Sequence, residues 1–291
     1  MGLIDLHVHA GPSVMPRALD GAEMLKEAQA AGYSAFVIKD HYFPTMMSAQ
    51  LVQQHLGDGS CKVFGGLALN NSVGGIDLKA VDAACAMGAK LIWMPTVSSL
   101  RHKQMHQGHG LAFPGSKGMT VEEDTIYYLD DSGQLKPQVL AVLDYLKDRP
   151  GVILATGHGS REEVDALIKE AARRGVKRIL VNHPHYMIGA TLEDMVAWSR
   201  LGAYIELNAT VFVPDSKFCT NDIAQCGEII RAVGLDRIVL DSDYGQNKNG
   251  SPVEGVRKFI DLLRTRCGVT DEGIKTITET NPAWLLDLQE A

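Results

Sequence analysis

The sequence predicts an α/β protein of the (β/α)₈ barrel class, the TIM barrel. Eight short runs of apolar and β-branched residues alternate with longer amphipathic segments along the chain. The predicted strands are almost continuously apolar, as parallel strands are when helices cover them. With 291 residues, the chain is long enough for eight such units. A doubly wound open sheet is the alternative, but its dinucleotide-binding form would place GxGxxG after the first strand, where this sequence has no such motif.

The individual elements follow from this alternation. The eight predicted strands lie at 3–8, 34–39, 62–69, 90–95, 151–156, 177–182, 203–208 and 237–242. Amphipathic segments predict helices at 20–32, 75–88, 137–151, 160–175, 191–202 and 226–234. Several of these segments begin at an Asp, Ser or Thr that can cap the first turn and end at a Gly that suits a C-cap. The last segment, 268–288, predicts one or two helices that close the bottom or the side of the barrel.

One connection is much longer than the others. Residues 96–136 lie between the fourth strand and the helix that begins near Pro137, and they contain a hairpin signal at 131–133. Long loops after barrel strands usually build or cover an active site. We therefore expect 96–136 to be an insertion over the site, within a single domain that spans residues 1–291.

The composition excludes several classes of protein. A net charge of −7 without a basic stripe argues against nucleic-acid binding. The N-terminus lacks the basic region of a secretory signal, and no apolar run approaches the roughly 20 residues of a membrane span. The five cysteines form no CxxC pair, which indicates reduced thiols. We expect a cytoplasmic protein with a small-molecule partner and leave open whether it forms a homo-oligomer.

Polar residues cluster where the predicted strands end, and these ends face the catalytic mouth in a parallel barrel. His7 and His9 end the first strand, and because they are two residues apart, both imidazoles can point to one ion. Imidazole and carboxylate ligands suit Zn²⁺, and also Fe²⁺, Mn²⁺ or Co²⁺. Further polar residues follow the other strands: Lys39, Asp40, His41, Asn70, Asn71, His158, His183, His185, Glu206, Asn208, Asp241 and Asp243.

The set resembles the amidohydrolase superfamily of metal-dependent hydrolases. The resemblance consists of "HVH" after the first strand, His158, His183 and an Asp after the eighth strand, in the family's order. "RIVLDSDYG" is similar to the segment in which the amidohydrolase-related branch carries its catalytic, metal-proximal carboxylate. The resemblance implies that Asp243 is a metal ligand and proton shuttle, with Asp241 as the alternative. The implied metal ligands are His7, His9, His158, His183 and Asp243.

The sequence departs from this family at the fourth strand, where many binuclear members have a bridging Lys or Glu. Here the strand ends without either residue, so a mononuclear site is one expectation. The alternative is that Lys39 or His41 supplies the missing group, and we predict both as catalytic residues. Lys39 has three candidate roles: an anion clamp, a modified bridging ligand or an amine nucleophile. A simple salt bridge with Asp40 is the structural alternative.

The expected reaction is hydrolysis of an amide, ester or lactone bond in a small molecule by a metal-bound hydroxide. Zn²⁺ is the expected cofactor, as one or two ions. Three alternatives remain: a phosphoesterase of the polymerase-and-histidinol-phosphatase type, a decarboxylase on the same barrel, and a barrel that binds a metal or ligand without turnover. In the long loop, His102, His106 and His109 are candidates for a second metal or for the substrate, or are simply solvated. The predicted substrate contacts are Asn70, His102, His185 and Asp241.

Overall fold

Eight parallel strands form one sheet whose spatial order follows the sequence from β1 to β8. The computed structural model describes residues 2–108, 119–121 and 123–288. Backbone pairing between Val8 and Tyr244, with a 2.9 Å hydrogen bond from the His9 amide to the Tyr244 carbonyl, joins the last strand to the first. The prediction of a (β/α)₈ barrel is therefore confirmed. The strands are β1 (Ile4–Val8), β2 (Ala35–Ile38), β3 (Lys62–Ala68), β4 (Leu91–Trp93), β5 (Ile153–Ala155), β6 (Ile179–Val181), β7 (Tyr204–Asn208) and β8 (Ile238–Asp241).

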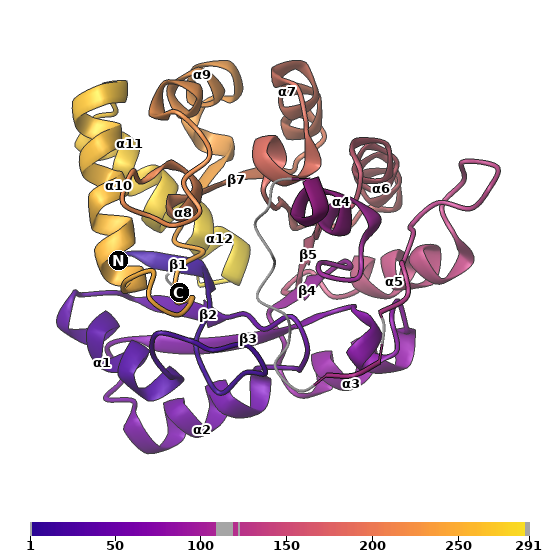
Figure 1. Ribbon diagram of the computed structural model, residues 1–291, viewed down its shortest axis with the longest axis horizontal. Helices are drawn as coiled ribbons and strands as arrows, with labels where there is room; N and C mark the ends of the chain where they lie inside the picture. Colours follow the sequence, from indigo (N-terminus) through magenta and orange to yellow (C-terminus); the bar gives the residue numbers. More distant parts are fainter. Residues whose placement is uncertain (1, 109–118, 122, 289–291) are drawn as a thin grey trace.

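Helices surround the strands (Figure 1). The six predicted helices are all present, as α1, α3, α5, α6, α7 and α9, while α2 and α10 were not predicted. In α2 only Met46 and Ala49 are buried, so its sequence shows little of the apolar periodicity that identifies a helix. The helices are α1 (Gly21–Ala30), α2 (Met46–Leu56), α3 (Leu78–Ala86), α4 (Leu100–Gly108), α5 (Pro137–Lys147), α6 (Arg161–Arg174), α7 (Leu192–Arg200), α8 (Ala209–Phe212), α9 (Ile223–Val233), α10 (Pro252–Cys267), α11 (Asp271–Lys275) and α12 (Asn281–Leu286).

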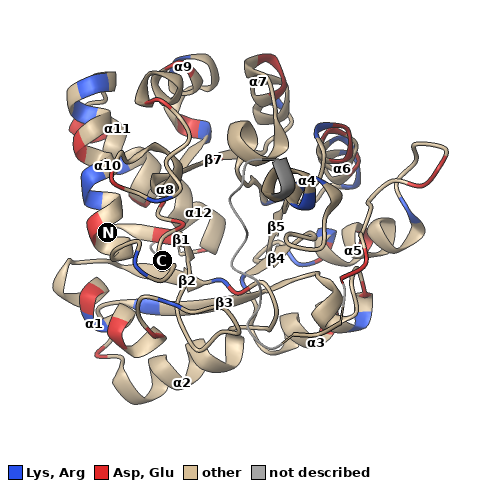
Figure 2. Ribbon diagram, in the orientation of Figure 1, with Lys and Arg blue, Asp and Glu red and all other residues tan. Residues whose placement is uncertain are grey.

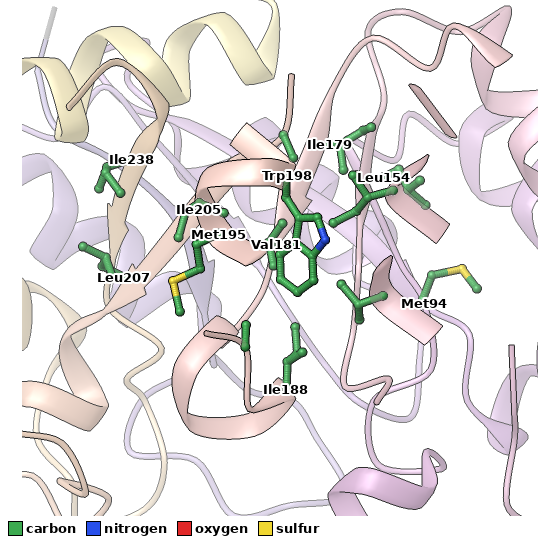
Figure 3. Packing of buried hydrophobic residues seen from close by; sticks show 14 of the residues in the cluster. Met94, Leu154, Ile179, Val181, Ile188, Met195, Trp198, Ile205, Leu207 and Ile238 are labelled. Carbon is green, nitrogen blue, oxygen red and sulfur yellow. The ribbon is translucent and has the colours of Figure 1, made fainter. Parts of the chain in front are cut away.

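The hydrophobic core has an inner and an outer part. Inside the barrel, the first residues of the strands, among them Ile4 and Leu91, pack against Leu285 and Leu286 of α12. The C-terminal segment thus closes the bottom of the barrel, and the carboxyl ends of the strands remain available for a site. Outside the barrel, a larger cluster joins strands and helices, and Figure 3 shows Trp198 of α7 at its centre, beside Val181 of β6.

The described residues of the long connection include a helix and a hairpin. Residues 100–108 form α4, and Leu129 pairs with Leu135 across the predicted hairpin turn. His102 and His106 lie on α4, whereas His109 lies outside the described residues. Along the outer helices, residues of both charge signs are mixed in the view of Figure 2. Among the described ranges, no helix combines the length and apolar character needed to cross a membrane.

Candidate metal centre and active site

The first two histidines reach the mouth of the barrel from the end of β1. The pairing between β1 and β2 shifts register between Asp5 and Val8, so His7 lies within an irregular part of the ladder, and His9 follows the last residue of β1. Their Nε2 atoms lie 3.2 and 3.0 Å from one oxygen, Oδ1 of Asp243.

His7 is oriented by a carboxylate at the end of β7. Its Nδ1 lies 2.8 Å from Oε1 of Glu206, and both side chains are fully buried. The second oxygen of Glu206 accepts a 2.9 Å hydrogen bond from the Asn182 amide. Because Glu206 is an acceptor, the imidazole donates through Nδ1 and directs the lone pair of Nε2 toward Asp243.

The other two histidines near Asp243 are oriented in the same way. His9 Nδ1 lies 3.3 Å from the carbonyl oxygen of Lys39, and His183 Nδ1 lies 2.7 Å from Oδ1 of Asn208. The Asn208 amide group in turn donates to Asp241, which fixes the direction of its oxygen. Both imidazoles therefore carry their proton on Nδ1 and present an unprotonated Nε2 to the site.

Three Nε2 lone pairs consequently face one carboxylate, since His183 Nε2 lies 4.0 Å from Oδ2 of Asp243. Acceptor atoms at 3.0 to 3.2 Å repel one another unless a positive charge lies between them. Two triads of possible metal donors occur among the described residues: His7, His9 and Asp243 form one, and His7, His183 and Glu206 form the other. Imidazole nitrogen and carboxylate oxygen are ligands for Zn²⁺ and related ions, so these residues fit a divalent metal.

Two of the four non-glycine residues with a positive φ angle in the described part of the chain belong to this site. His183 and Asp243 both have positive φ angles, of 47° and 50°, which residues other than glycine rarely adopt. Strained conformations persist where the surrounding structure enforces them, and they cluster at functional sites. The strain supports a functional role for both side chains.

Burial sets the protonation states of the site. It lowers the pKa of His9 to about 3, with the charge of Arg17 adding to the effect, so the imidazole is neutral. Burial alone would raise the pKa of Asp243, but the electrostatic influence of the neighbouring imidazoles of His7, His9 and His183 outweighs it and holds the pKa below its ordinary value. By contrast, burial and the neighbouring Glu206 raise the pKa of Asp241 well above its usual range. Of the two candidate carboxyls, the surroundings thus favour the ionised form of Asp243 and the neutral form of Asp241.

Lys39 places a buried amine beside the first histidine. Its Nζ lies 2.9 Å from His7 Nε2 and 5.7 Å from the centre of the Trp93 ring. Burial lowers its pKa, although the charges of Asp243 and Glu206 oppose the shift. The contact that the structure gives Lys39 is to His7 and not to Asp40, whose carboxylate pairs with Arg17.

A cavity of about 260 Å³ opens beside these groups. His41 lies on its wall with Nδ1 2.9 Å from the Thr96 hydroxyl, and His158 lies there with Nδ1 2.9 Å from Nδ1 of His102. His158 Nε2 is buried and has no hydrogen-bond partner among the residues described. His158 is in neither of the donor triads found among the described residues, but its ring centre lies 5.1 Å from that of His183, and its predicted role as a metal ligand stays a prediction. The cavity is lined by His9, Met15, Pro16, Arg17, Lys39, His41, His102, His106, His158, His183, Tyr186, Met187, Thr210, Val211, Phe218, Asp243, Gln246 and Asn247.

Three of the four predicted substrate contacts lie away from this cavity lining. Asn70 is fully buried, and it hydrogen-bonds the His41 carbonyl and the Thr96 hydroxyl behind the wall. Asp241 accepts a hydrogen bond from the Asn208 amide, and His185 hydrogen-bonds Asn221 beside a smaller pocket. His102 is the predicted contact that does line the cavity.

Sequence reasoning did not select Glu206 and Asn208 as site residues, although both follow the apolar run of β7. Their position at a strand end was the available signal, and their role depends on His7 and His183, which are distant in sequence. Arg17 was also missed, because a single Arg in a loop of glycine and proline has no recognisable spacing.

Comparison with solved structures shows what this barrel is similar to. An amidohydrolase from Pseudomonas aeruginosa superposes with a TM-score of 0.66 at 12% identity, over 98% of this chain and 95% of that one. A metallo peptidase from Rhodobacter sphaeroides, liganded with a phosphinate mimic of a dipeptide, gives 0.60 at 13% identity over 99% of both chains. A lactonase from Listeria monocytogenes gives 0.60 at 10% identity over 99% and 95%. At these identities the likeness concerns the fold, and it confirms the resemblance to amidohydrolase barrels at that level.

Sequence comparisons give a family without an activity. A search of curated proteins found no match. One family model, described as a family of unknown function (DUF6282), matches residues 2–206. Because this match covers more than half of the sequence, the chain belongs to the DUF6282 family.

Proposed function

We propose that this protein is a metal-dependent hydrolase that acts on an amide, ester or lactone bond of a small molecule. The observation that carries the proposal is the convergence of the Nε2 atoms of His7, His9 and His183 on Asp243 at the wall of a cavity. Structural neighbours described as an amidohydrolase, a metallo peptidase and a lactonase support this class of reaction.

His7, His9 and Asp243 would hold the cation, with His183 as the further nitrogen ligand. When bound, a divalent cation lowers the pKa of a water molecule and polarises a carbonyl group. Zn²⁺ is the ion that we propose, and the same ligand types also accept Mn²⁺, Fe²⁺ and Co²⁺.

The protein's own groups have distinct tasks. Asp243 stays ionised, so its Oδ2 can accept a proton from the attacking water. Lys39 puts an amine on the cavity wall, where its charge would stabilise the oxyanion that develops on the substrate carbonyl. His158 offers a buried Nε2, unsatisfied among the described residues, that can form a hydrogen bond with the substrate or its leaving group.

The test combines metal analysis with a substrate panel. The purified protein is analysed by mass spectrometry for bound metal and assayed on lactones, dipeptides, aryl esters and aryl phosphates. We expect stoichiometric metal and turnover of a carboxyl-centred substrate. We expect His9→Asn to lose at least about 100-fold in metal affinity, more than the loss of a residue that only supports a ligand.

His55→Asn is the matched control, because His55 is an exposed histidine on α2 that is not among the residues lining the cavity. A protein that binds no metal, or a His9→Asn variant with unchanged metal content and rate, would overturn the proposal. Turnover confined to aryl phosphates would favour the phosphoesterase alternative.

A further inference from the structure

Arg17 lies in the loop between β1 and α1, and its backbone is tied to the loop that follows β8. The amide of Ala18 donates a 2.9 Å hydrogen bond to the Gly245 carbonyl, and the amide of Asn247 donates to the Pro16 carbonyl at 3.3 Å. Arg17 itself pairs with Gln246 in an antiparallel bridge. These contacts fix Arg17 next to the segment that carries Asp243.

The Arg17 side chain is buried on the cavity wall. It is 4% exposed, and it lines the same cavity as His9, Lys39 and Asp243. One guanidinium nitrogen lies 3.3 Å from Oδ2 of Asp40, a long contact for a charged pair. The Nε–H group is buried and has no hydrogen-bond partner within the described part of the chain. A buried N–H group without a partner can donate a hydrogen bond to an acceptor atom of a bound ligand.

Asp40 neutralises Arg17 only in part, because its oxygens accept several other hydrogen bonds. The backbone amides of Tyr42 and Phe43 donate to Oδ1 at 2.8 and 3.1 Å, and the Ser13 hydroxyl donates to Oδ2. The carboxylate therefore keeps partners if Arg17 is replaced, which makes the position suitable for mutation. Because Asp40 is shared among these donors, the Arg17 guanidinium keeps N–H groups that can donate to a ligand.

The cavity as a whole favours a small organic anion. Arg17 contributes a guanidinium group and Lys39 an amine, and Asp243 is the acidic group among the described residues that line the space. Met15, Tyr186 and Phe218 add apolar surface for a carbon skeleton. The nearby charge of Asp40 disfavours a phosphate dianion more than a carboxylate monoanion, since repulsion grows with ligand charge.

We propose that Arg17 binds a carboxylate group of the substrate, so that the hydrolase acts on a carboxylic acid whose scissile bond lies beside Asp243. This assignment deepens the proposed function and rests on it for the reaction, but not for the binding of the carboxylate. Planar guanidinium groups recognise carboxylates through paired N–H donors, which a lysine cannot reproduce.

The test measures binding by calorimetry with succinate, glutarate and adipate, each against a monocarboxylic acid of the same chain length. The full-length protein is used as purified with its metal and again after treatment with a chelator. We expect at least one diacid to bind about 10-fold more tightly than its monoacid. We expect Arg17→Met to abolish this preference in both preparations, and Arg17→Lys to reduce it.

Arg161→Met is the matched control, because Arg161 also pairs with an aspartate, Asp194, but on the surface. It should keep the preference, and thermal melting of each variant checks that it folds. If Arg17→Met does not fold, Arg17→Lys alone decides the test. The proposal is overturned if the unmodified protein shows no preference for a diacid over its monoacid, or if the folded Arg17 variants keep that preference unchanged. It is also overturned if inorganic phosphate binds through Arg17 more tightly than every diacid.

Failure of the two proposals can be told apart. If the protein holds no metal, the preference for diacids that depends on Arg17 persists in the chelator-treated sample. If the protein hydrolyses substrates with its metal but shows no such preference, the carboxylate subsite is wrong and the hydrolase stands.

Discussion

The Nε2 atom of His9 lies 3.0 Å from Oδ1 of Asp243, and neither atom has a proton to share. The imidazole donates its proton to the Lys39 carbonyl through Nδ1, and burial keeps the ring neutral, with a pKa of about 3. Asp243 is ionised, because its pKa is held below the ordinary range. The contact is favourable when a cation lies between the two atoms, and this relationship guides the predictions below.

The two aspartates of β8 and its loop should differ in their effect on metal binding. Asp243→Asn removes the charged oxygen that faces three imidazoles, and we expect a loss of metal affinity greater than about 100-fold. Asp241→Asn replaces a neutral carboxyl by a neutral amide of the same shape, and we expect a change of at most about 10-fold. Competition with a chromophoric chelator measures both values. Equal losses in the two variants would contradict the assignment of Asp243 as the ligand.

Glu206 should affect metal affinity indirectly, because it contacts Nδ1 of His7 and not Nε2, the nitrogen that faces Asp243. Glu206→Gln weakens the acceptor that fixes His7 Nδ1, and residues in this position usually contribute about 10- to 100-fold to metal affinity. The same chelator competition measures the effect. Glu228→Gln, an exposed change on α9, serves as control and should leave the affinity unchanged. A Glu206→Gln protein with wild-type affinity would show that this contact does not orient the ligand.

The stability of the chelator-treated protein should fall as the solution becomes acidic. The pKa values of His9, His41, His102, His158 and His183 are lowered, chiefly by burial, so below pH 6.5 the unfolded chain binds more protons than the folded one. Stability therefore rises with pH between about 4.5 and 6.5, by about 1.4 kcal/mol per pH unit for each neutral histidine. Asp5 and Asp241 oppose this trend, since their raised pKa values make the folded state hold protons.

Urea unfolding at several pH values measures this slope, and one variant isolates a single histidine. His41→Asn keeps a polar atom near the Thr96 hydroxyl but removes the titrating ring. Its slope should be smaller than that of the wild type by about one proton. An unchanged slope would mean that His41 is not the neutral, buried group described above.

The outer core should depend strongly on Trp198. Its side chain is fully buried, and its indole N–H donates a 3.1 Å hydrogen bond to Asp165. Trp198→Ala should cost about 3–5 kcal/mol of unfolding free energy, measured by urea denaturation. Leu201→Ala, at a residue that is 41% exposed, should change stability by less than about 0.5 kcal/mol. Similar losses for the two variants would contradict the packing shown in Figure 3.

Much of the fold could be predicted because its signals are local. Each strand is a short apolar run, and α6 opens at Ser160 with a capping box and ends at Gly175 with a positive φ. α2 was not predicted because it has two buried residues, too few for an apolar periodicity, and no side-chain hydrogen bond that caps its first turn. For α4, the sequence indicated a single helical turn that would place His102 and His106 on one face, whereas the helix spans Leu100–Gly108.

The site could be predicted in part. The histidines and Asp243 were found because they end apolar runs, and parallel strands bring such ends to one rim. Glu206, Asn208 and Arg17 were not selected, because their importance arises from contacts across the barrel, such as those to His7, which no spacing records. Asn70 and Asp241 also occupy strand ends, yet their side chains hydrogen-bond the His41 carbonyl and the Asn208 amide, respectively, and do not line the cavity.

The sequence by itself determined the barrel and the kinds of donor atoms at its mouth, since alternation of apolar runs and the position of each polar residue are one-dimensional properties. Only the tertiary structure decided which nitrogen of each histidine faces Asp243, which aspartate is ionised and which cation lies beside the cavity. These outcomes depend on burial and on atoms within about 3 to 4 Å of each other, contributed by strands that are far apart in the chain.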